Sequence, residues 1–165
     1  MTAADSAISV LVLGIGNLVM SDDGVGVVVA QQLQQRFRFP DTVEVLDGGT
    51  LGLDLLPKLE HITHLIMIDA VETGERPGTC VRLSGEELPI ALQTKVSPHQ
   101  MGLKDLLAVS ELMGHSPKEM VLIGVQPGSI EMAVGLTAAV EAVLENLISN
   151  VLFELANFGI VVTAD

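Results

Sequence analysis

Three residues of the kinds that bind metal ions or catalyse hydrolysis each follow, or end, an apolar stretch typical of a β-strand. Asp23 lies in the sequence VLVLGIGNLVMSDDGVG, Asp69 lies near the end of HLIMIDA, and His99 lies in SPHQMG. If these stretches belong to one parallel sheet, folding carries their carboxyl ends to one edge, where such folds bind ligands. Two carboxylates and one imidazole suit a divalent ion such as nickel or zinc and leave coordination positions open. The sequence therefore predicts a metal or catalytic site at Asp23, Asp69 and His99.

The spacing of apolar residues predicts the strands and helices that would position these side chains. Strands are expected at residues 9–13, 42–46, 64–68, 79–83 and 120–125, and helices at residues 25–37, 51–59, 98–113 and 137–157. The turn at residues 74–78 is too short for a helical crossover, so we expect strand 79–83 to be antiparallel to strand 64–68. The alternation predicts a three-layer α/β/α fold, with residues 1–165 as a single domain around a mostly parallel, twisted sheet.

The helix expected at residues 25–37 has one apolar face. Apolar side chains recur at helical spacing at Val25, Val28, Val29, Leu33 and Phe37, and polar residues fall on the other faces. Valine is only a moderate helix former, so we expect packing of this face to hold the helix in place.

Charge and composition exclude several classes of partner. The chain has a formal net charge of −13, so nucleic acid and anionic membrane surfaces would be repelled over a Debye length of about 8 Å. The apolar segment 144–162 is interrupted by polar residues, which favours a core helix over a membrane span. The single cysteine, Cys80, excludes an intramolecular disulfide, and the sequence MTAADSA lacks the features of a signal peptide. We expect a cytoplasmic monomer with a neutral or basic partner.

The glycine-rich turn after the first strand also raises the possibility of a dinucleotide site. The sequence GIGNLV has the first two glycines of the dinucleotide-binding pattern, but Val19 stands where the third glycine should allow close helix packing. Asp22 and Asp23 would stand where a pyrophosphate binds and would repel it. These features argue against a nucleotide site.

Each candidate site residue also has an ordinary structural interpretation. Ser21, Asp22 and Asp23 could cap the following helix, although two adjacent aspartates exceed what a cap requires. Asp69 ends an apolar run, where a carboxylate costs free energy unless it is paired, hydrogen-bonded or metal-bound. His99 follows Ser97 and Pro98, which favour a helix start, and the first turn of a helix favours a neutral, ligand-competent imidazole.

The other residues able to do chemistry lack such a setting. His61, His64 and His115 are assigned to the surface or to packing. Cys80 falls within an expected strand and has no histidine nearby in sequence, so we expect a small packing residue rather than a nucleophile.

Taken together, the motifs resemble the endopeptidases that mature NiFe hydrogenases. The resemblance extends from about residue 10 to residue 143 and rests on segments that occur in the family's order: LGIGNLVMSDDGVG, VLDGGT, LIMIDAV, PGT, SPHQMG, LIGVQP and GLT. It implies a five-stranded sheet within an α/β/α fold and a metal-binding trio that maps onto Asp23, Asp69 and His99. Family members have Glu or Asp at the position of Asp23. Asp22 would be a neighbouring cap, and the segment Asp47, Gly48, Gly49 and Thr50 a loop that contacts substrate.

The resemblance also implies a reaction and a partner. The enzyme would be a hydrolase that removes a C-terminal extension from the hydrogenase large-subunit precursor after nickel insertion, so the nickel would be carried by the substrate. Either the metal activates the carbonyl or water, or an aspartate acts as general base in the manner of an aspartyl protease. Two other functions remain open: a non-catalytic nickel or zinc chaperone, and an α/β enzyme acting on a small molecule.

Overall fold

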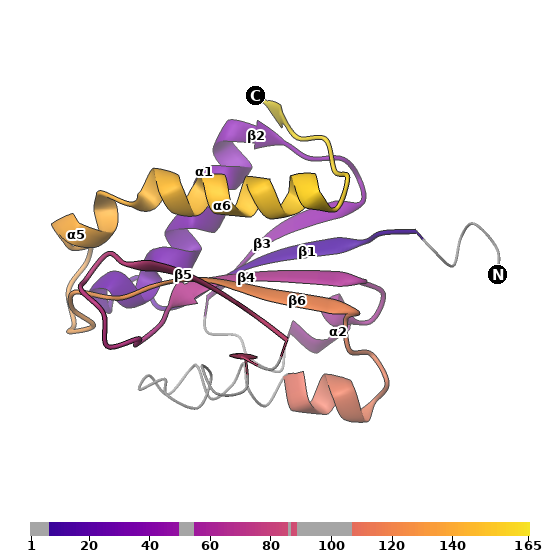
Figure 1. The fold of residues 1–165 in the computed structure, drawn as a ribbon, viewed down its shortest axis with the longest axis horizontal. Coiled ribbons are helices and arrows are strands. Elements are labelled where there is room, and N and C mark those ends of the chain that lie inside the picture. Colours follow the sequence, from indigo (N-terminus) through magenta and orange to yellow (C-terminus); the bar gives the residue numbers. More distant parts are fainter. Residues whose placement is uncertain (1–6, 50–54, 86, 89–106) are drawn as a thin grey trace.

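The computed structural model describes residues 7–49, 55–85, 87–88 and 107–165, and within them the chain is organised around a five-stranded sheet (Figure 1). The strands lie in the order β3-β1-β4-β6-β5. β1, β3, β4 and β6 are parallel, and β5 is antiparallel to β6. The bounds are β1 Val10–Ile15, β3 Val43–Gly49, β4 His64–Ala70, β5 Cys80–Ser84 and β6 Glu119–Val125. The predicted mostly parallel sheet with one antiparallel strand is confirmed.

The antiparallel strand β5 has a different neighbour from the one expected. β5 runs opposite to β4, as the short turn predicted, but it pairs with β6. The connection from β4 crosses the carboxyl end of β6, where the Val71 N–H donates to Val125 O and the Gly78 N–H donates to Gln126 O. β6 therefore lies between β4 and β5, and β5 forms the antiparallel edge strand on the far side of β6.

Helices cover both faces of the sheet and complete three layers (Figure 1). On one face lie α1, Val25–Arg36, and α6, Leu144–Asn157. On the other face lie α2, Leu56–Leu59, and a short helical segment at residues 107–112. A 3-10 turn η2, Ser21–Gly24, precedes α1, and α5, Ala138–Glu141, precedes α6. None of the helices in the described residues is long and apolar enough to cross a membrane.

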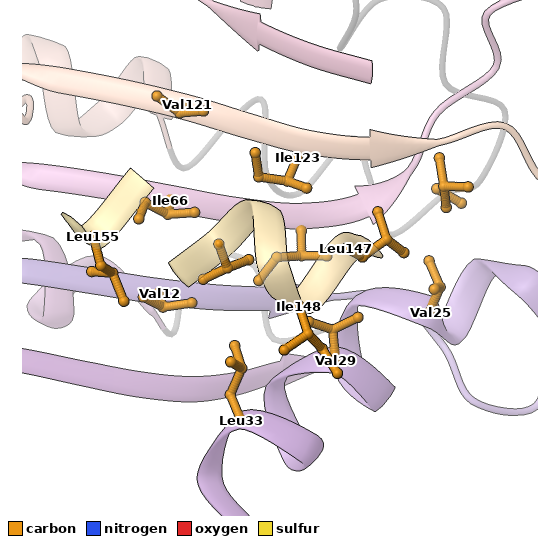
Figure 2. Close-up of a cluster of buried hydrophobic side chains, with 14 of the residues drawn as sticks. Val12, Val25, Val29, Leu33, Ile66, Val121, Ile123, Leu147, Ile148 and Leu155 are labelled. Atoms are coloured by element: carbon orange, nitrogen blue, oxygen red, sulfur yellow. The ribbon is translucent and has the colours of Figure 1, made fainter. Parts of the chain in front are cut away.

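The strands supply alternate side chains to two separate cores. In β1, Val10 and Val12 face α1 and α6, whereas Leu11 and Leu13 face α2. Figure 2 shows the first core, where Val29 and Ile148 from the two helices lie close to the sheet. Because both faces are buried, the central strands have continuous apolar sequences rather than an alternating pattern.

Several element boundaries differ from those expected. The helix expected at 137–157 is interrupted at Val143, whose backbone (φ −107°, ψ 8°) leaves the helical region. The interruption leaves no trace in the apolar pattern because Val143 and Leu144 both pack against the core. Of the helices expected at 51–59 and 98–113, residues 51–54 and 98–106 lie outside the described residues.

A small sheet was not anticipated from the sequence. It pairs β2, Phe37–Arg38, with β7, Thr163–Ala164, in antiparallel orientation. Two-residue strands on the surface have no periodic apolar pattern, so nothing in the sequence identified them. As a consequence α1 ends at Arg36, and Phe37 belongs to the strand that follows.

The buried face of α1 is shifted slightly from the expected one. Val25, Val29 and Leu33 are buried as predicted, but Val28 is only half-buried and Val27 is buried in its place. The helix begins close against the sheet, since a Cβ on Gly26 would overlap the carbonyl oxygens of Ile68 and Ile15. Glycine at position 26 therefore lets α1 begin against the ends of β1 and β4.

We predict that Gly26→Ala lowers the free energy of unfolding by about 1–3 kcal/mol, although alanine is the better helix former. The added methyl group must displace the backbone of β1 or β4, because the overlapping atoms are carbonyl oxygens. The matched control is Gln35→Ala at an exposed position of the same helix, which should change stability by less than about 0.5 kcal/mol. Urea unfolding measures both values, and equal stability of the two variants would contradict the close approach.

Candidate functional site

Asp23 and Asp69 lie on neighbouring elements at the carboxyl edge of the sheet. Asp69 is the penultimate residue of β4, and Asp23 belongs to η2, which contacts β4. Both carboxylates are almost completely removed from solvent, with exposed fractions of 0% and 1% for Asp69 and Asp23. His99 lies outside the described residues. The joining of all three residues in one site therefore stays a prediction.

A tight turn between β1 and η2 positions Asp23. The Asn17 N–H donates to Oδ2 of Asp23 at 3.1 Å, and Asn17 Oδ1 accepts the Val19 N–H at 3.1 Å. Gly16 has φ 133°, and a Cβ at that position would overlap the carbonyl oxygen of Asp23. The glycine and asparagine of the sequence GIGN thus serve to fold the chain back onto η2.

Asp69 occupies a position where a carboxylate is expensive to bury. Its neighbours Ile68 and Ala70 are buried, and Oδ1 accepts the N–H of Ala70 at 2.8 Å. In the sheet it pairs with Gly124 of β6. Burial of a charged group costs free energy that packing alone does not return. Its place at the carboxyl end of a buried parallel strand makes Asp69 a candidate for chemistry.

Asp22 does not cap a helix, contrary to the role expected for it. Its Oδ2 accepts the Gly128 N–H at 2.7 Å, the Ser129 N–H at 3.2 Å and the Thr137 hydroxyl at 2.7 Å. Its Oδ1 accepts the Thr137 N–H at 2.7 Å, and η2 has no side-chain capping bond. This fully buried carboxylate instead fastens η2 to the segment that joins β6 to α5.

Two residues of this edge, Ser21 and Gln126, have roles that the sequence did not predict. Ser21 is buried and has φ 52°, a left-handed conformation that strains a residue with a side chain by about 1–3 kcal/mol. Its N–H donates to Ala133 O at 2.8 Å. Gln126 Oε1 accepts the N–H and hydroxyl of Thr73, at 2.6 and 2.9 Å, and so holds the connection between β4 and β5. Neither role has a local sequence signal, since the partners are distant in the chain.

The segment expected to contact substrate is only partly described. Asp47 and Gly48 are part of β3, which continues to Gly49 instead of ending at Leu46. Asp47 is half-buried, and its Oδ2 accepts a hydrogen bond from Gln31 Nε2 of α1 at 3.2 Å. Thr50 lies outside the described residues, and contact of this segment with substrate stays a prediction.

His61, His64 and Cys80 lie in positions that agree with the surface or packing roles expected for them. His61 is exposed, and the half-buried His64 packs against the ring of Phe158 at 4.3 Å. Burial lowers the pKa of His64 and raises the pKa of the Cys80 thiol. A raised thiol pKa disfavours the thiolate, so Cys80 is poorly suited to act as a nucleophile.

The described residues supply only part of a metal site. Among them no group of three or more His, Cys, Asp or Glu side chains is placed to hold an ion. Two buried carboxylates are suitable oxygen donors for a divalent metal. A three-ligand site would need a donor from outside the described residues, and His99 stays the predicted one.

Comparisons with known proteins identify the family to which the chain is similar. Residues 27–154 match the model of the hydrogenase maturation protease family. The chain is 43% identical over 152 residues to the hydrogenase 2 maturation protease of Escherichia coli K12, covering 92% of this chain and 93% of that protein. It is 42% identical over 156 residues to HupD of Rhodobacter capsulatus, a hydrogenase expression/formation protein, covering 93% and 74% of the two chains.

Solved structures show the same similarity. The hydrogenase maturating endopeptidase HybD of E. coli superimposes with a TM-score of 0.91 at 41% identity, covering 95% of this chain and 98% of that chain. A hydrogenase maturation protease of Thermococcus kodakarensis superimposes with a TM-score of 0.70 at 28% identity, covering 87% and 97%. The fold of the sheet and its helices is therefore shared with these proteins.

We predict that Asp22→Asn lowers the free energy of unfolding by at least about 1–3 kcal/mol, because an amide has one accepting oxygen and turns its NH₂ group toward buried donors. Asp41→Asn, at an exposed position before β3, is the matched control and should change stability by less than about 0.5 kcal/mol. Thermal or urea unfolding of both variants measures the difference. If Asp22→Asn unfolds like the control, the carboxylate does not hold this edge together.

Proposed function

This chain belongs to the hydrogenase maturation protease family and is a peptidase, and we propose that it removes a C-terminal extension from the large-subunit precursor of a NiFe hydrogenase after nickel insertion. The observation that carries the proposal is the buried carboxylate of Asp69 at the end of β4, next to the η2 turn that contains Asp23. Because the proteins that share this fold are proteases, we infer that Asp23 and Asp69 take part in peptide-bond hydrolysis.

In the proposed reaction Asp23, Asp69 and His99 recognise nickel that the precursor brings with it. The metal is part of the substrate, and it supplies a positive charge that attracts the two carboxylates. Recognition of a loaded metal centre makes cleavage conditional on nickel insertion. The donor set agrees with this role, since two oxygens and an imidazole leave positions of a divalent ion to be filled by the precursor.

Cleavage itself is hydrolysis of one peptide bond. A water oxygen adds to the scissile carbonyl carbon, the C–N bond breaks, and the departing nitrogen takes up a proton. The water must lose a proton in this process, and a carboxylate of Asp23 or Asp69 within hydrogen-bond reach is a suitable acceptor. A metal ion can also polarise the carbonyl or activate the water. Both routes use the same edge of the sheet.

The rival functions are less well supported. A non-catalytic metal chaperone or a small-molecule enzyme could use the same carboxylates, but relatives that match over nine-tenths of the chain are named proteases or endopeptidases. The single cysteine, a half-buried free thiol, suits a reducing compartment. The proposal accordingly places the reaction in the cytoplasm and has the protease act as a monomer.

We predict that Asp23→Asn, Asp69→Asn and His99→Ala each reduce processing by at least about 10²-fold, because each removes a ligand or proton acceptor from the reacting centre. The mass of the nickel-loaded precursor after incubation measures processing, and a melting curve shows whether each variant is folded. Asp41→Asn removes a carboxylate exposed at the opposite edge and should process normally. Complete processing by the folded Asp69→Asn or His99→Ala protein would refute the assignment.

We also predict that the protein purifies largely free of nickel. A closed structural site normally needs four protein ligands, and the proposed site has three, so its affinity for free metal should be modest. Metal analysis after dialysis against a chelator measures the content. Stoichiometric nickel that survives this treatment would show that the ion is resident in the protease rather than delivered by the substrate.

A further inference from the structure

Four large apolar side chains lie exposed beside the candidate site, on two segments that are far apart in the sequence. They are Leu18, Val19, Met132 and Val134, with exposed fractions of 42%, 49%, 82% and 88%. They make up half of the exposed large apolar residues in the described part of the chain. We refer to these four residues as the apolar rim. Exposed apolar residues gathered in this way mark interaction surfaces, whereas single ones need no explanation.

The backbone beneath the apolar rim is held firmly. Met20 and Ala133 form a parallel β-bridge, in which the Ala133 N–H donates to Val19 O at 3.0 Å and the Ser21 N–H donates to Ala133 O at 2.8 Å. The Asp22 N–H donates to Ser129 O at 3.0 Å, beside the bonds that its carboxylate accepts. The rim is therefore preorganised, which reduces the entropy lost when a partner binds.

The apolar rim borders the candidate site directly. The Asn17 N–H binds the carboxylate of Asp23, and Leu18 follows Asn17 in the chain. Asp22, adjacent to Asp23, binds both ends of the segment that contains Met132 and Val134. A partner segment bound on the apolar rim would therefore extend directly into the candidate site at Asp23.

The charges around this edge restrict the partner. Glu131 is exposed beside Met132. At the same edge, Gln126 binds the connection between β4 and β5. That connection exposes two acidic residues, Glu72 and Glu75, and one basic residue, Arg76. This acidic setting favours a partner with basic side chains. A second copy of the chain, also with a net charge of −13, would bring like charges together and is disfavoured.

We propose that the apolar rim binds a segment of the hydrogenase large-subunit precursor that carries apolar and basic side chains and adjoins the bond to be cut. This inference rests on the proposed function and adds the surface that holds the substrate. The rim supplies binding energy away from the reacting atoms, so it determines affinity and not the chemical step.

The experiment compares lysine substitutions at two equally exposed apolar positions. Val134→Lys changes the rim, and Leu112→Lys changes a residue 87% exposed on the helical segment that precedes β6, at the opposite end of the sheet (Figure 1). The dissociation constant for the purified, nickel-loaded precursor is measured for each, together with kcat and KM for processing. Val134→Glu is added to test the charge of the bound segment.

We expect Val134→Lys to raise Kd and KM about tenfold with kcat unchanged, Leu112→Lys to behave as wild type, and Val134→Glu to lose less affinity than Val134→Lys. Wild-type affinity of Val134→Lys, or equal losses in Val134→Lys and Leu112→Lys, would overturn the docking surface. A greater loss in Val134→Glu would overturn the basic segment.

The same measurements separate this inference from the proposed function. If the wild-type protein binds the precursor without cutting it, the proposed function fails, and the Kd values still decide whether the rim is the docking surface. If the wild-type protein neither binds nor cuts the precursor, both proposals fail. If it cuts and Val134→Lys binds normally, only the docking surface fails.

Discussion

The arrangement of the carboxyl edge of the sheet depends on the hydrogen bonds that the buried carboxylate of Asp22 accepts. It joins the chain between β1 and α1 to the chain between β6 and α5 through hydrogen bonds to Gly128, Ser129 and Thr137. Because β4 lies between β1 and β6 in the sheet, this link connects the segments on either side of the strand that carries Asp69. Asp23 is thereby fixed beside β4 by the bonds of its neighbour. Asp22 thus has a structural role at this edge, and the proposed role in chemistry falls to its neighbour Asp23.

Most of the sheet could be predicted from the sequence because its central strands are buried on both faces. A continuous apolar run such as that of β4 has few alternative interpretations, and a carboxylate at its end marks the edge that faces solvent or ligand. The neighbour of β5 could not be predicted, since strand order depends on pairing between segments forty residues apart. The interruption at Val143 was hidden for a different reason, because Val143 and Leu144 both pack against the core and continue the apolar pattern.

The position of a candidate residue could be predicted where the residue stands out from its sequence neighbours. It could not be predicted where contacts with distant segments decide the residue's role. Asp69 is conspicuous in sequence because apolar residues surround it. Asp22 resembles a helix cap, and its true partners lie more than a hundred residues away. The left-handed backbone of Ser21 has no sequence signature either, since the residue is not glycine and the hydrogen-bond partner of its N–H, Ala133 O, is distant in the chain. Tertiary contacts decide such positions, and a single sequence contains no record of them.

The proposed mechanism combines a rigid, acidic edge with a metal carried by the substrate. In the proposed reaction the nickel-loaded precursor brings positive charge to two carboxylates that are kept out of solvent. The most direct test is to incubate the wild-type protein with nickel-loaded and nickel-free large-subunit precursor and to measure the mass of each product. We expect only the nickel-loaded precursor to lose its extension. Equal cleavage of both forms would contradict recognition of the metal.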